Sequence, residues 1–239
     1  MKLIYGLLVV SIFFNLGTCS ADELDEFSDE MAVEEVYDPL SGYNRAMTSF
    51  NDVLYENVMK PVASGYANVV HTEIRESISK FFHNLYFPMR LTNNLLQGKF
   101  KNSLEESERF VLNSTVGILG FFDPAKSKFE IDKHNEDFGQ TLGFYGVGAG
   151  PHVVLPLFGP SNVRDTISMI PDSLLSPIDY VARKDDITIL EYVAIKTVEK
   201  VNCTSQNIEK YEKLKADAID LYPYQRDVYE QYRQEQIEE

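Results

Sequence analysis

Few side chains in this sequence are grouped in a way that would support catalysis. The four histidines are scattered and show no spacing typical of metal ligands: His71, His83, His134 and His152. There is no Gly-x-Ser-x-Gly motif for a serine nucleophile, and no local motif of a catalytic cysteine surrounds Cys203. We therefore expect no enzyme activity, no metal site and no cofactor.

Two other segments carry residue types that occur in binding sites. Residues 132–137 place several carboxylates around His134, and this pattern predicts a solvated loop that leads into a helix. The glycines at 146, 148 and 150 alternate as in a nucleotide-binding loop, but they lack the preceding strand, the helix that opens on the last glycine and the later acidic residue. We expect neither segment to bind a metal or a phosphate.

Cys19 is the residue whose surroundings predict a covalent modification. Lys2 and the apolar residues 3–16 form an export signal that is too short to be a comfortable membrane span, so residues 1–18 are predicted to be a cleaved signal peptide. The preceding residues are similar to a lipobox, although Thr18 stands where a smaller residue is usual, and they predict acylation of Cys19. The alternative is cleavage after Ala21, which would discard Cys19.

The charge of the chain is strongly negative and uneven. A net charge of −15 and a pI near 4.7 exclude a nucleic-acid-binding protein, and no basic stripe opposes that conclusion. Acidic residues crowd the segment after the signal, where like charges repel and favour an extended chain. Residues 19–36 are therefore predicted to be a flexible tether between a membrane anchor and the folded domain of residues 37–239.

The first half of the folded domain shows apolar residues at helical spacing. Met47, Phe50, Leu54 and Val58 predict one face of a first helix, and Pro61 predicts the start of a second. The pattern continues through residues 74–85, is interrupted at Pro88 and resumes until Gly98, which is a typical helix end. Residues 104–119 predict another helix that ends near Gly120.

The middle and the end of the chain differ from each other. Glycines and prolines crowd residues 139–160, and this composition predicts irregular or hairpin-like structure without a long helix. Helical spacing returns from Ile187, and a further polar helix is predicted from Ser205, bent or broken at Pro223. The predicted class is all-α with a glycine-rich irregular or hairpin insert. The many Phe and Tyr residues fit either a helical core or a face in a membrane interface.

Four blocks in this order resemble the MlaA/VacJ lipoproteins. The blocks are residues 38–47 with Phe50 and Asn51, residues 81–98, residues 109–125 and the glycine-rich run of residues 137–165. Arg226, Asp227, Tyr229 and Gln231 are more loosely similar to the family's last helix. The resemblance covers most of the chain after the predicted signal.

The resemblance implies a ring-like bundle of amphipathic helices in the inner leaflet of the outer membrane, on its periplasmic side. Phospholipids that have strayed into the outer leaflet would pass through an amphipathic channel to the periplasmic carrier MlaC, commonly with a trimeric porin beside the ring. Phospholipids, the outer membrane, MlaC and a porin are thus the expected partners. The alternative is an envelope scaffold or virulence-associated lipoprotein that moves no lipid.

Two groups of residues are expected to act in such a channel. Asn44, Arg45, Phe50 and Asn51 match the family's first-helix motif, in a region thought to control access from the leaflet. The glycines at 143, 146, 148 and 150 permit backbone angles closed to other residues, so Gly143, Gly146, Gly148 and Gly150 are predicted to form a loop hinge at the channel mouth. The alternative is that these glycines only form ordinary tight turns.

Overall fold

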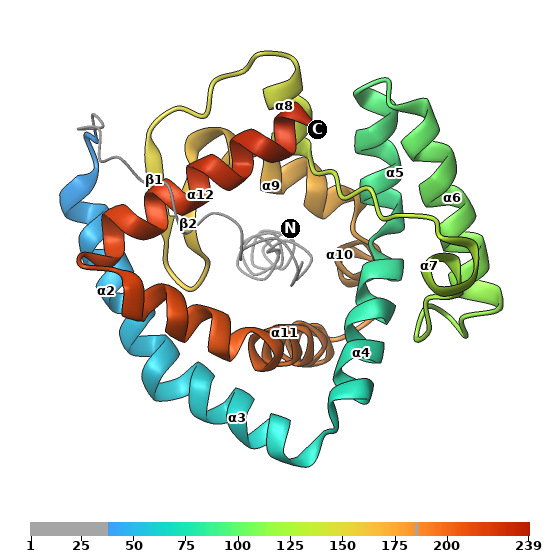
Figure 1. Ribbon diagram of the computed structural model, residues 1–239, viewed down its shortest axis with the longest axis horizontal. Helices are drawn as coiled ribbons and strands as arrows, with labels where there is room; N and C mark the ends of the chain where they lie inside the picture. The colour runs from blue at the N-terminus through green and yellow to red at the C-terminus, as the bar shows by residue number, and fades with distance from the viewer. Residues whose placement is uncertain (1–37, 185) are drawn as a thin grey trace.

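The computed structural model describes residues 38–184 and 186–239, which form a ring of helices with one short hairpin (Figure 1). The predicted signal peptide, Cys19 and the predicted tether lie outside the described residues. The helices are α2 (Ser41–Leu54), η2 (Tyr55–Met59), α3 (Lys60–Val69), α4 (Thr72–Leu85), α5 (Phe87–Leu96), α6 (Phe100–Thr115), α7 (Pro124–Phe129), α8 (Phe138–Phe144), α9 (Val163–Leu175), α10 (Pro177–Arg183), α11 (Ile189–Asp217) and α12 (Leu221–Glu238). The predicted all-α class with a hairpin insert is confirmed.

The first helical run is longer than the sequence predicts. α2 continues through the π-helical turn η2 into α3 without leaving helical backbone geometry, and Pro61 lies in the first turn of α3, as predicted. Proline has no N–H, and the wider turn immediately before it lets the helix continue without a clash with the preceding carbonyl groups. The run therefore forms one long side of the ring, next to α11 in Figure 1.

The next helices end close to the predicted positions. Tyr86 separates α4 from α5 just before Pro88, and Gly98 follows α5 with a φ of 73°, as expected for a helix end. α6 ends at Thr115 and not near Gly120. A turn follows in which Ile118 and Leu119 adopt the left-handed region, with φ of 52° and 56°.

The glycine-rich middle contains a short helix and a hairpin. Asp137 and Gln140 form a reciprocal cap at the start of α8, which fixes the entry of the chain into this helix. Strands β1 (His152–Leu155) and β2 (Gly159–Asn162) pair antiparallel, with His152 opposite Asn162 and Leu155 opposite Gly159. The predicted hairpin-like structure is therefore confined to the second part of this region.

The C-terminal half contains the largest departure from the prediction. α11 runs unbroken past Ser205 to Asp217, and the break falls at residues 218–220, so the predicted helix start at Ser205 is wrong. Pro223 lies in the first turn of α12, where its missing N–H has no helical partner to lose, so it neither bends nor breaks the helix. α9 and α10 were not indicated by the apolar spacing.

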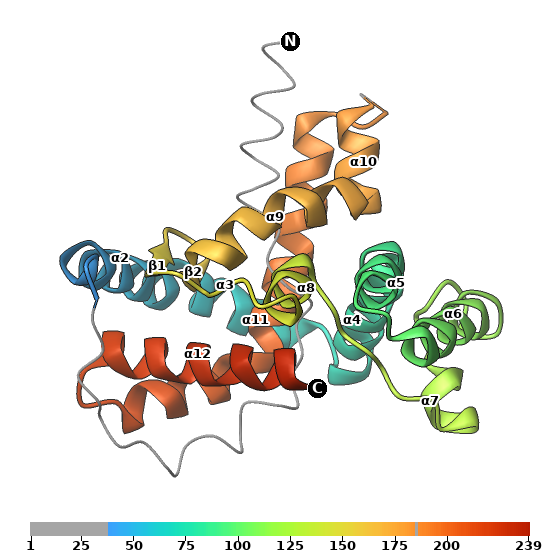
Figure 2. The same cartoon turned by 90° about the horizontal axis from the view of Figure 1, so that it is seen from above.

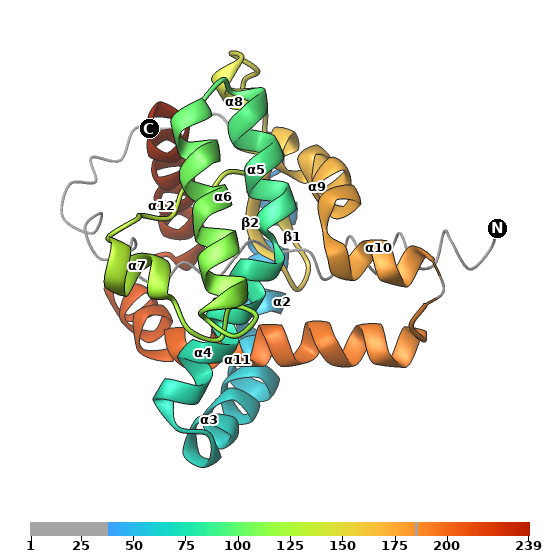
Figure 3. The same cartoon turned by 90° about the vertical axis from the view of Figure 1, so that its right-hand side faces the viewer.

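The ring has two different faces (Figures 2 and 3). α12 lies on one face, and α9, α10 and the first part of α11 project from the opposite face. A small apolar core lies where α4, α10 and α11 meet, around Phe82, Ile178 and Tyr192. No helix within the described part of the chain is long and apolar enough to cross a membrane.

Most buried side chains of the described residues are polar or charged, whereas many large apolar side chains are exposed. Buried examples are Asn44, Arg90, Asn93, Glu106, Gln140, Asp179 and Lys196. Exposed examples occur on most helices and on the turn after α6: Val58, Val62, Val69, Phe100, Leu104, Val111, Ile118, Leu119, Phe122, Ile167, Ile170 and Leu174. A globular protein in water has the opposite distribution.

Candidate functional site

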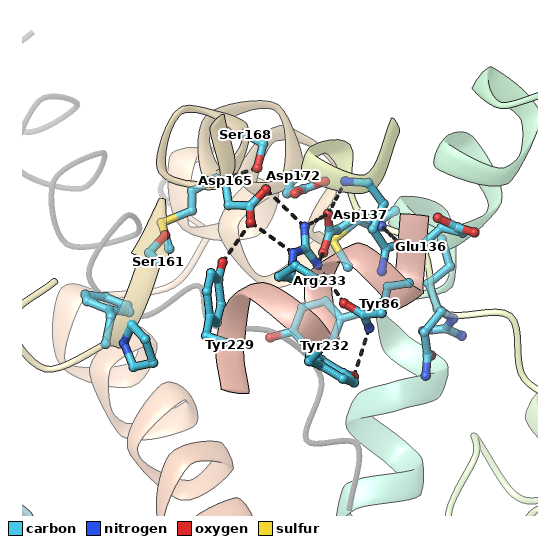
Figure 4. A pocket seen from close by; sticks show the side chains of 18 of the residues that line it. Tyr86, Glu136, Asp137, Ser161, Asp165, Ser168, Asp172, Tyr229, Tyr232 and Arg233 are labelled. Carbon is cyan, nitrogen blue, oxygen red and sulfur yellow. Dashed lines mark hydrogen bonds and ion pairs between the residues drawn. The ribbon is translucent and has the colours of Figure 1, made fainter. Parts of the chain in front are cut away.

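A cavity of about 250 Å³ lies inside the ring (Figure 4). Its wall is built by α5, the segment before α8, α8 itself, the hairpin, α9 and α12, so segments from most of the chain enclose it. Two cationic side chains line it, Arg90 and Arg233, together with four carboxylates. These are Glu136, Asp137, Asp165 and Asp172.

Arg233, a buried side chain on α12, ties three elements together. Its two terminal nitrogens donate to the carboxylate of Asp137 at 2.7 and 2.9 Å, and its Nε donates to Asp165 Oδ2 at 2.9 Å. Asp137 caps α8 and Asp165 lies in the first turn of α9 (Figure 4). Bidentate pairs of this kind fix geometry as well as charge, so Arg233 holds α8, α9 and α12 around the cavity.

Asp165 remains ionised at this position. Burial alone would raise its pKa, but the attraction of Arg233 and hydrogen bonds from Arg233, Arg164 and Tyr229 hold the pKa of Asp165 below its usual value. The hydroxyl of Tyr229 donates to Asp165 Oδ2 at 2.7 Å, and Arg164 Nε donates to Oδ1 at 2.9 Å. The charge of Asp165 is therefore stabilised by two guanidinium groups and one hydroxyl group.

Asp172 behaves differently from the other carboxylates of the wall. It is only 8% exposed, and it accepts hydrogen bonds from uncharged donors, the backbone N–H of Phe138 at 3.1 Å and the side-chain amide of Asn93 at 3.3 Å. Burial, followed by repulsion from Asp137, raises the pKa of Asp172 from 3.8 to about 8. At neutral pH this carboxyl group carries a proton.

The remaining charged side chains of the wall form ion pairs with residues that do not line the cavity. Arg90 Nε donates to Glu106 at 2.8 Å, and both side chains are almost fully buried. Glu136 accepts from Lys99 at 2.6 Å and is itself buried. The prediction that residues 132–137 form a solvated loop is therefore wrong for Glu136. Its buried charge is tolerated because Lys99 compensates it. The segment does lead into α8, as predicted.

The four residues of the predicted first-helix motif fall into two pairs. Asn44 is fully buried, donates to the carbonyl oxygen of His152 at 3.0 Å and accepts from the N–H of Val154 at 2.9 Å. Asn51 donates to the carbonyl oxygen of Leu155 at 2.9 Å and accepts from the N–H of Leu157 at 2.7 Å. The two amides therefore attach β1 and the hairpin turn to α2.

Arg45 and Phe50 lie on the outside of the same helix. Arg45 forms an ion pair of 2.5 Å with Asp220, in the link between α11 and α12, and both side chains are about half exposed. Phe50 is 47% exposed. The motif thus joins α2 to the hairpin on one side and to the start of α12 on the other.

The four predicted hinge glycines also differ from one another. Gly143 lies within α8, where a Cβ would come within 2.5 Å of Ile237 on α12. Gly146 and Gly150 have positive φ, 81° and 72°, and lie within the segment that connects α8 to β1. Gly148 lies between them, with no atom within 4 Å of the position of a Cβ.

The histidines have separate partners. His83 Nε2 lies 2.9 Å from Asn135, His134 Nε2 lies 2.6 Å from Glu105, and His152 Nδ1 lies 2.9 Å from Glu230. Within the described ranges, no group of three or more potential ligands could hold a metal ion.

The charged cluster of the cavity is the feature that sequence reasoning missed. One signal was present: Tyr222, Arg226, Tyr229 and Arg233 follow one another at helical spacing along α12. Such a stripe of tyrosine and arginine on an otherwise polar helix indicates a buried polar face. Which carboxylates it meets depends on α8 and α9, which are distant in sequence.

Comparisons with known proteins give a consistent result. The family model described as "MlaA lipoprotein" matches residues 36–236. An uncharacterised protein of Rickettsia typhi is 39% identical over 158 residues, which are 65% of this chain and 62% of that protein. The "Intermembrane phospholipid transport system lipoprotein MlaA" of Escherichia coli is 40% identical over 131 residues, which are 54% of this chain and 52% of that protein. The chain thus aligns with less than two thirds of either relative.

A solved structure matches most of the chain. It was reported under the words "Structural basis for maintenance of bacterial outer membrane lipid asymmetry", and it superposes with a TM-score of 0.73 at 30% identity. The match covers 84% of this chain and 100% of that one. The similarity therefore extends over nearly the whole ring and is not limited to single motifs.

Proposed function

Because the chain belongs to the MlaA lipoprotein family, we propose that it moves phospholipid out of the outer membrane through the cavity of the ring. The observation that carries this proposal is the reversed distribution of side chains. The ring has apolar residues on its outside and paired charges in its interior. An apolar exterior is stable against acyl chains, and a polar interior lowers the cost of taking a charged headgroup out of water.

The ring need not cross the membrane to do this. Its exposed apolar side chains lie on α3, α5, α6, α9 and the turn after α6, so they are distributed around the body. We place these exposed apolar side chains in the inner leaflet of the outer membrane, on the periplasmic side, with an acylated Cys19 as an additional anchor. Each buried CH₂ of an acyl chain would add about 0.8 kcal/mol to membrane binding.

The hairpin is the element that we assign to gating. It forms one part of the cavity wall through Leu155, Phe158 and Ser161, and it is attached to α2 through Asn44 and Asn51. The segment before it carries Gly146 and Gly150 in the left-handed region, where other residues are strained. A change of backbone angle there would move the hairpin relative to α8 and alter the opening.

The route then ends at a soluble acceptor. We propose that lipid leaves the ring for a periplasmic carrier of the MlaC type, with a trimeric porin beside the ring in the membrane. No chemical step is needed, because the lipid is moved intact and the charged groups of the cavity are engaged with one another. The protein therefore acts as a lipid conduit and not as an enzyme.

Bound lipid tests this function against a non-transporting scaffold. The full-length protein would be purified in a mild detergent, and phospholipid in an organic extract would be measured against a helical membrane protein without a lipid cavity. We expect phospholipid in amounts comparable to the protein. A lipid content equal to that of the control would support the scaffold, and release of fatty acid from labelled phospholipid would support a hydrolase.

A further inference from the structure

Most charged side chains that line the cavity are already paired with another charged side chain. The two guanidinium groups that reach the cavity are already occupied, Arg233 by Asp137 and Asp165, and Arg90 by Glu106. Among the residues that line the described cavity, no arginine or lysine is left for an anionic group. Every phospholipid brings one phosphate charge, and in phosphatidylglycerol no amine compensates it, so its headgroup would meet only neutral, acidic or already paired groups.

One carboxyl group of the wall, that of Asp172, forms no ion pair with the described residues and has only uncharged hydrogen-bond partners. Asp172 is more than nine-tenths buried, borders the cavity and receives hydrogen bonds from the uncharged amide groups of Phe138 and Asn93. Asp137, the carboxylate that repels Asp172, is engaged by Arg233. An ammonium group placed beside Asp172 would give this carboxyl group a cationic partner with up to three hydrogen-bond donors.

We propose that the cavity selects phospholipids whose headgroup ends in a primary ammonium group, and that Asp172 accepts that group. This inference rests on the proposed function, because it assumes that a headgroup enters the cavity. Phosphatidylethanolamine fits the requirement, since its ammonium group donates hydrogen bonds and its net charge is zero. Phosphatidylcholine has the charge but no N–H donor, and phosphatidylglycerol has a net negative charge.

The proton balance of the step is simple. The empty cavity holds Asp172 in its neutral form because burial raises the pKa of this carboxyl group. When the ammonium group arrives, Asp172 releases its proton to water and forms an ion pair with the headgroup. The headgroup brings the charges of its ammonium and phosphate groups, Asp172 adds one negative charge, and the proton released to water carries the balancing positive charge.

The experiment is a competition among three lipids. Full-length protein in detergent would be incubated with an equimolar mixture of phosphatidylethanolamine, phosphatidylcholine and phosphatidylglycerol at pH 7.5, reisolated and extracted. We expect phosphatidylethanolamine to be enriched about tenfold or more over phosphatidylglycerol, as one charged hydrogen bond allows. Phosphatidylcholine should lie between the two.

Asp172→Asn is the informative variant, because asparagine has the shape of the neutral carboxyl group that the empty cavity contains. We expect the variant to bind phospholipid with the enrichment of phosphatidylethanolamine lost. Glu199→Gln is the matched control, because burial also raises the pKa of Glu199 but this residue does not line the cavity. The control should keep the wild-type ratio.

The possible results separate the selectivity from the transport function. Wild-type protein that binds the three lipids in the supplied ratio would overturn the selectivity while leaving the transport function intact. Retained enrichment in Asp172→Asn would show that Asp172 does not accept the headgroup. Absence of phospholipid from the wild type would reject both proposals, and the wild-type ratio remains decisive if the variant does not fold.

Discussion

Asn44 and Asn51 lie about two helical turns apart on α2 and hold the two ends of strand β1. Asn44 binds the backbone at His152 and Val154, and Asn51 binds it at Leu155 and Leu157. Because both amides point to the same side of the helix, α2 and the hairpin are attached as one unit. The position of the cavity wall therefore depends on the rotation of α2.

The two amides should differ in their contribution to stability. Asn44→Ala leaves a buried N–H and a buried carbonyl group without partners, so we expect the free energy of unfolding to fall by about 2–4 kcal/mol. Asn51→Ala exposes its partners to water, and we expect a loss of about 1 kcal/mol or less. Thermal unfolding in detergent, followed by circular dichroism, measures both. Equal losses would contradict the role assigned to the buried amide.

Deletion of Phe50 and Asn51 tests the coupling between α2 and the hairpin. Removal of two residues turns the part of α2 before the deletion by about 200° relative to the part after it, and it also removes one of the two amides. We expect uncontrolled lipid flow and a leaky outer membrane, seen as sensitivity to a large antibiotic in cells that carry only this variant. An intact permeability barrier in those cells would refute the coupling.

Gly139 should be needed for the charged cluster. A Cβ at this position would come within 2.4 Å of Asp165 Oδ1 and 2.6 Å of Arg233 Nη2, so Gly139→Ala must displace the ion pair. We expect a loss of about 2 kcal/mol or more in stability. Gly148→Ala is the matched control, because its Cβ meets no atom within 4 Å and should change stability by less than about 0.5 kcal/mol. Similar stability of the two variants in chemical denaturation would be inconsistent with the geometry.

The pH dependence of stability should report on Asp172. Its pKa is raised from 3.8 to about 8, so the folded protein keeps a proton that the unfolded chain loses in this interval. The contribution to stability is fully present below about pH 4 and is lost as the pH rises towards 8. Asp172→Asn should remove this loss. Its free energy of unfolding should therefore exceed that of the wild type by on the order of a few kcal/mol as the pH rises from 4 to 8.

Chemical denaturation of the two proteins at several pH values measures this difference. A difference in the free energy of unfolding that stays constant from pH 4 to 8 would show that Asp172 is ionised in the folded protein. Below pH 4 the wild-type residue is neutral in both the folded and the unfolded state. The difference in the free energy of unfolding should therefore be smallest there.

Apolar spacing predicted the helices that show one continuous apolar stripe. It found α2 and the end of α5 at Gly98, because a stripe and a terminal glycine are local features. It did not find α9, whose stripe of Val163, Ile167, Ile170 and Leu174 is exposed. It placed a break at Ser205 because α11 changes from an apolar to a polar face as it passes from α10 to α3.

The site was accessible from sequence only in part. The motif of residues 44–51 was recognised through its family resemblance, but its attachment to β1 joins residues more than 100 positions apart. The cluster of Asp137, Asp165 and Arg233 has the same difficulty, because an acidic cap, an acidic first turn and an arginine near the C-terminus each resemble solvated surface positions. Only the closure of the ring brings them together.

Two adjacent residues on α9 provide the most direct test of the proposed lipid route. Met169 lines the cavity, whereas Ile170 is exposed on the outside of the ring. Met169→Trp should fill much of the cavity, and Ile170→Trp should leave it open. We predict that protein carrying Met169→Trp copurifies with little phospholipid, and that protein carrying Ile170→Trp retains the wild-type amount. Equal phospholipid in the two variants would contradict passage of lipid through the ring.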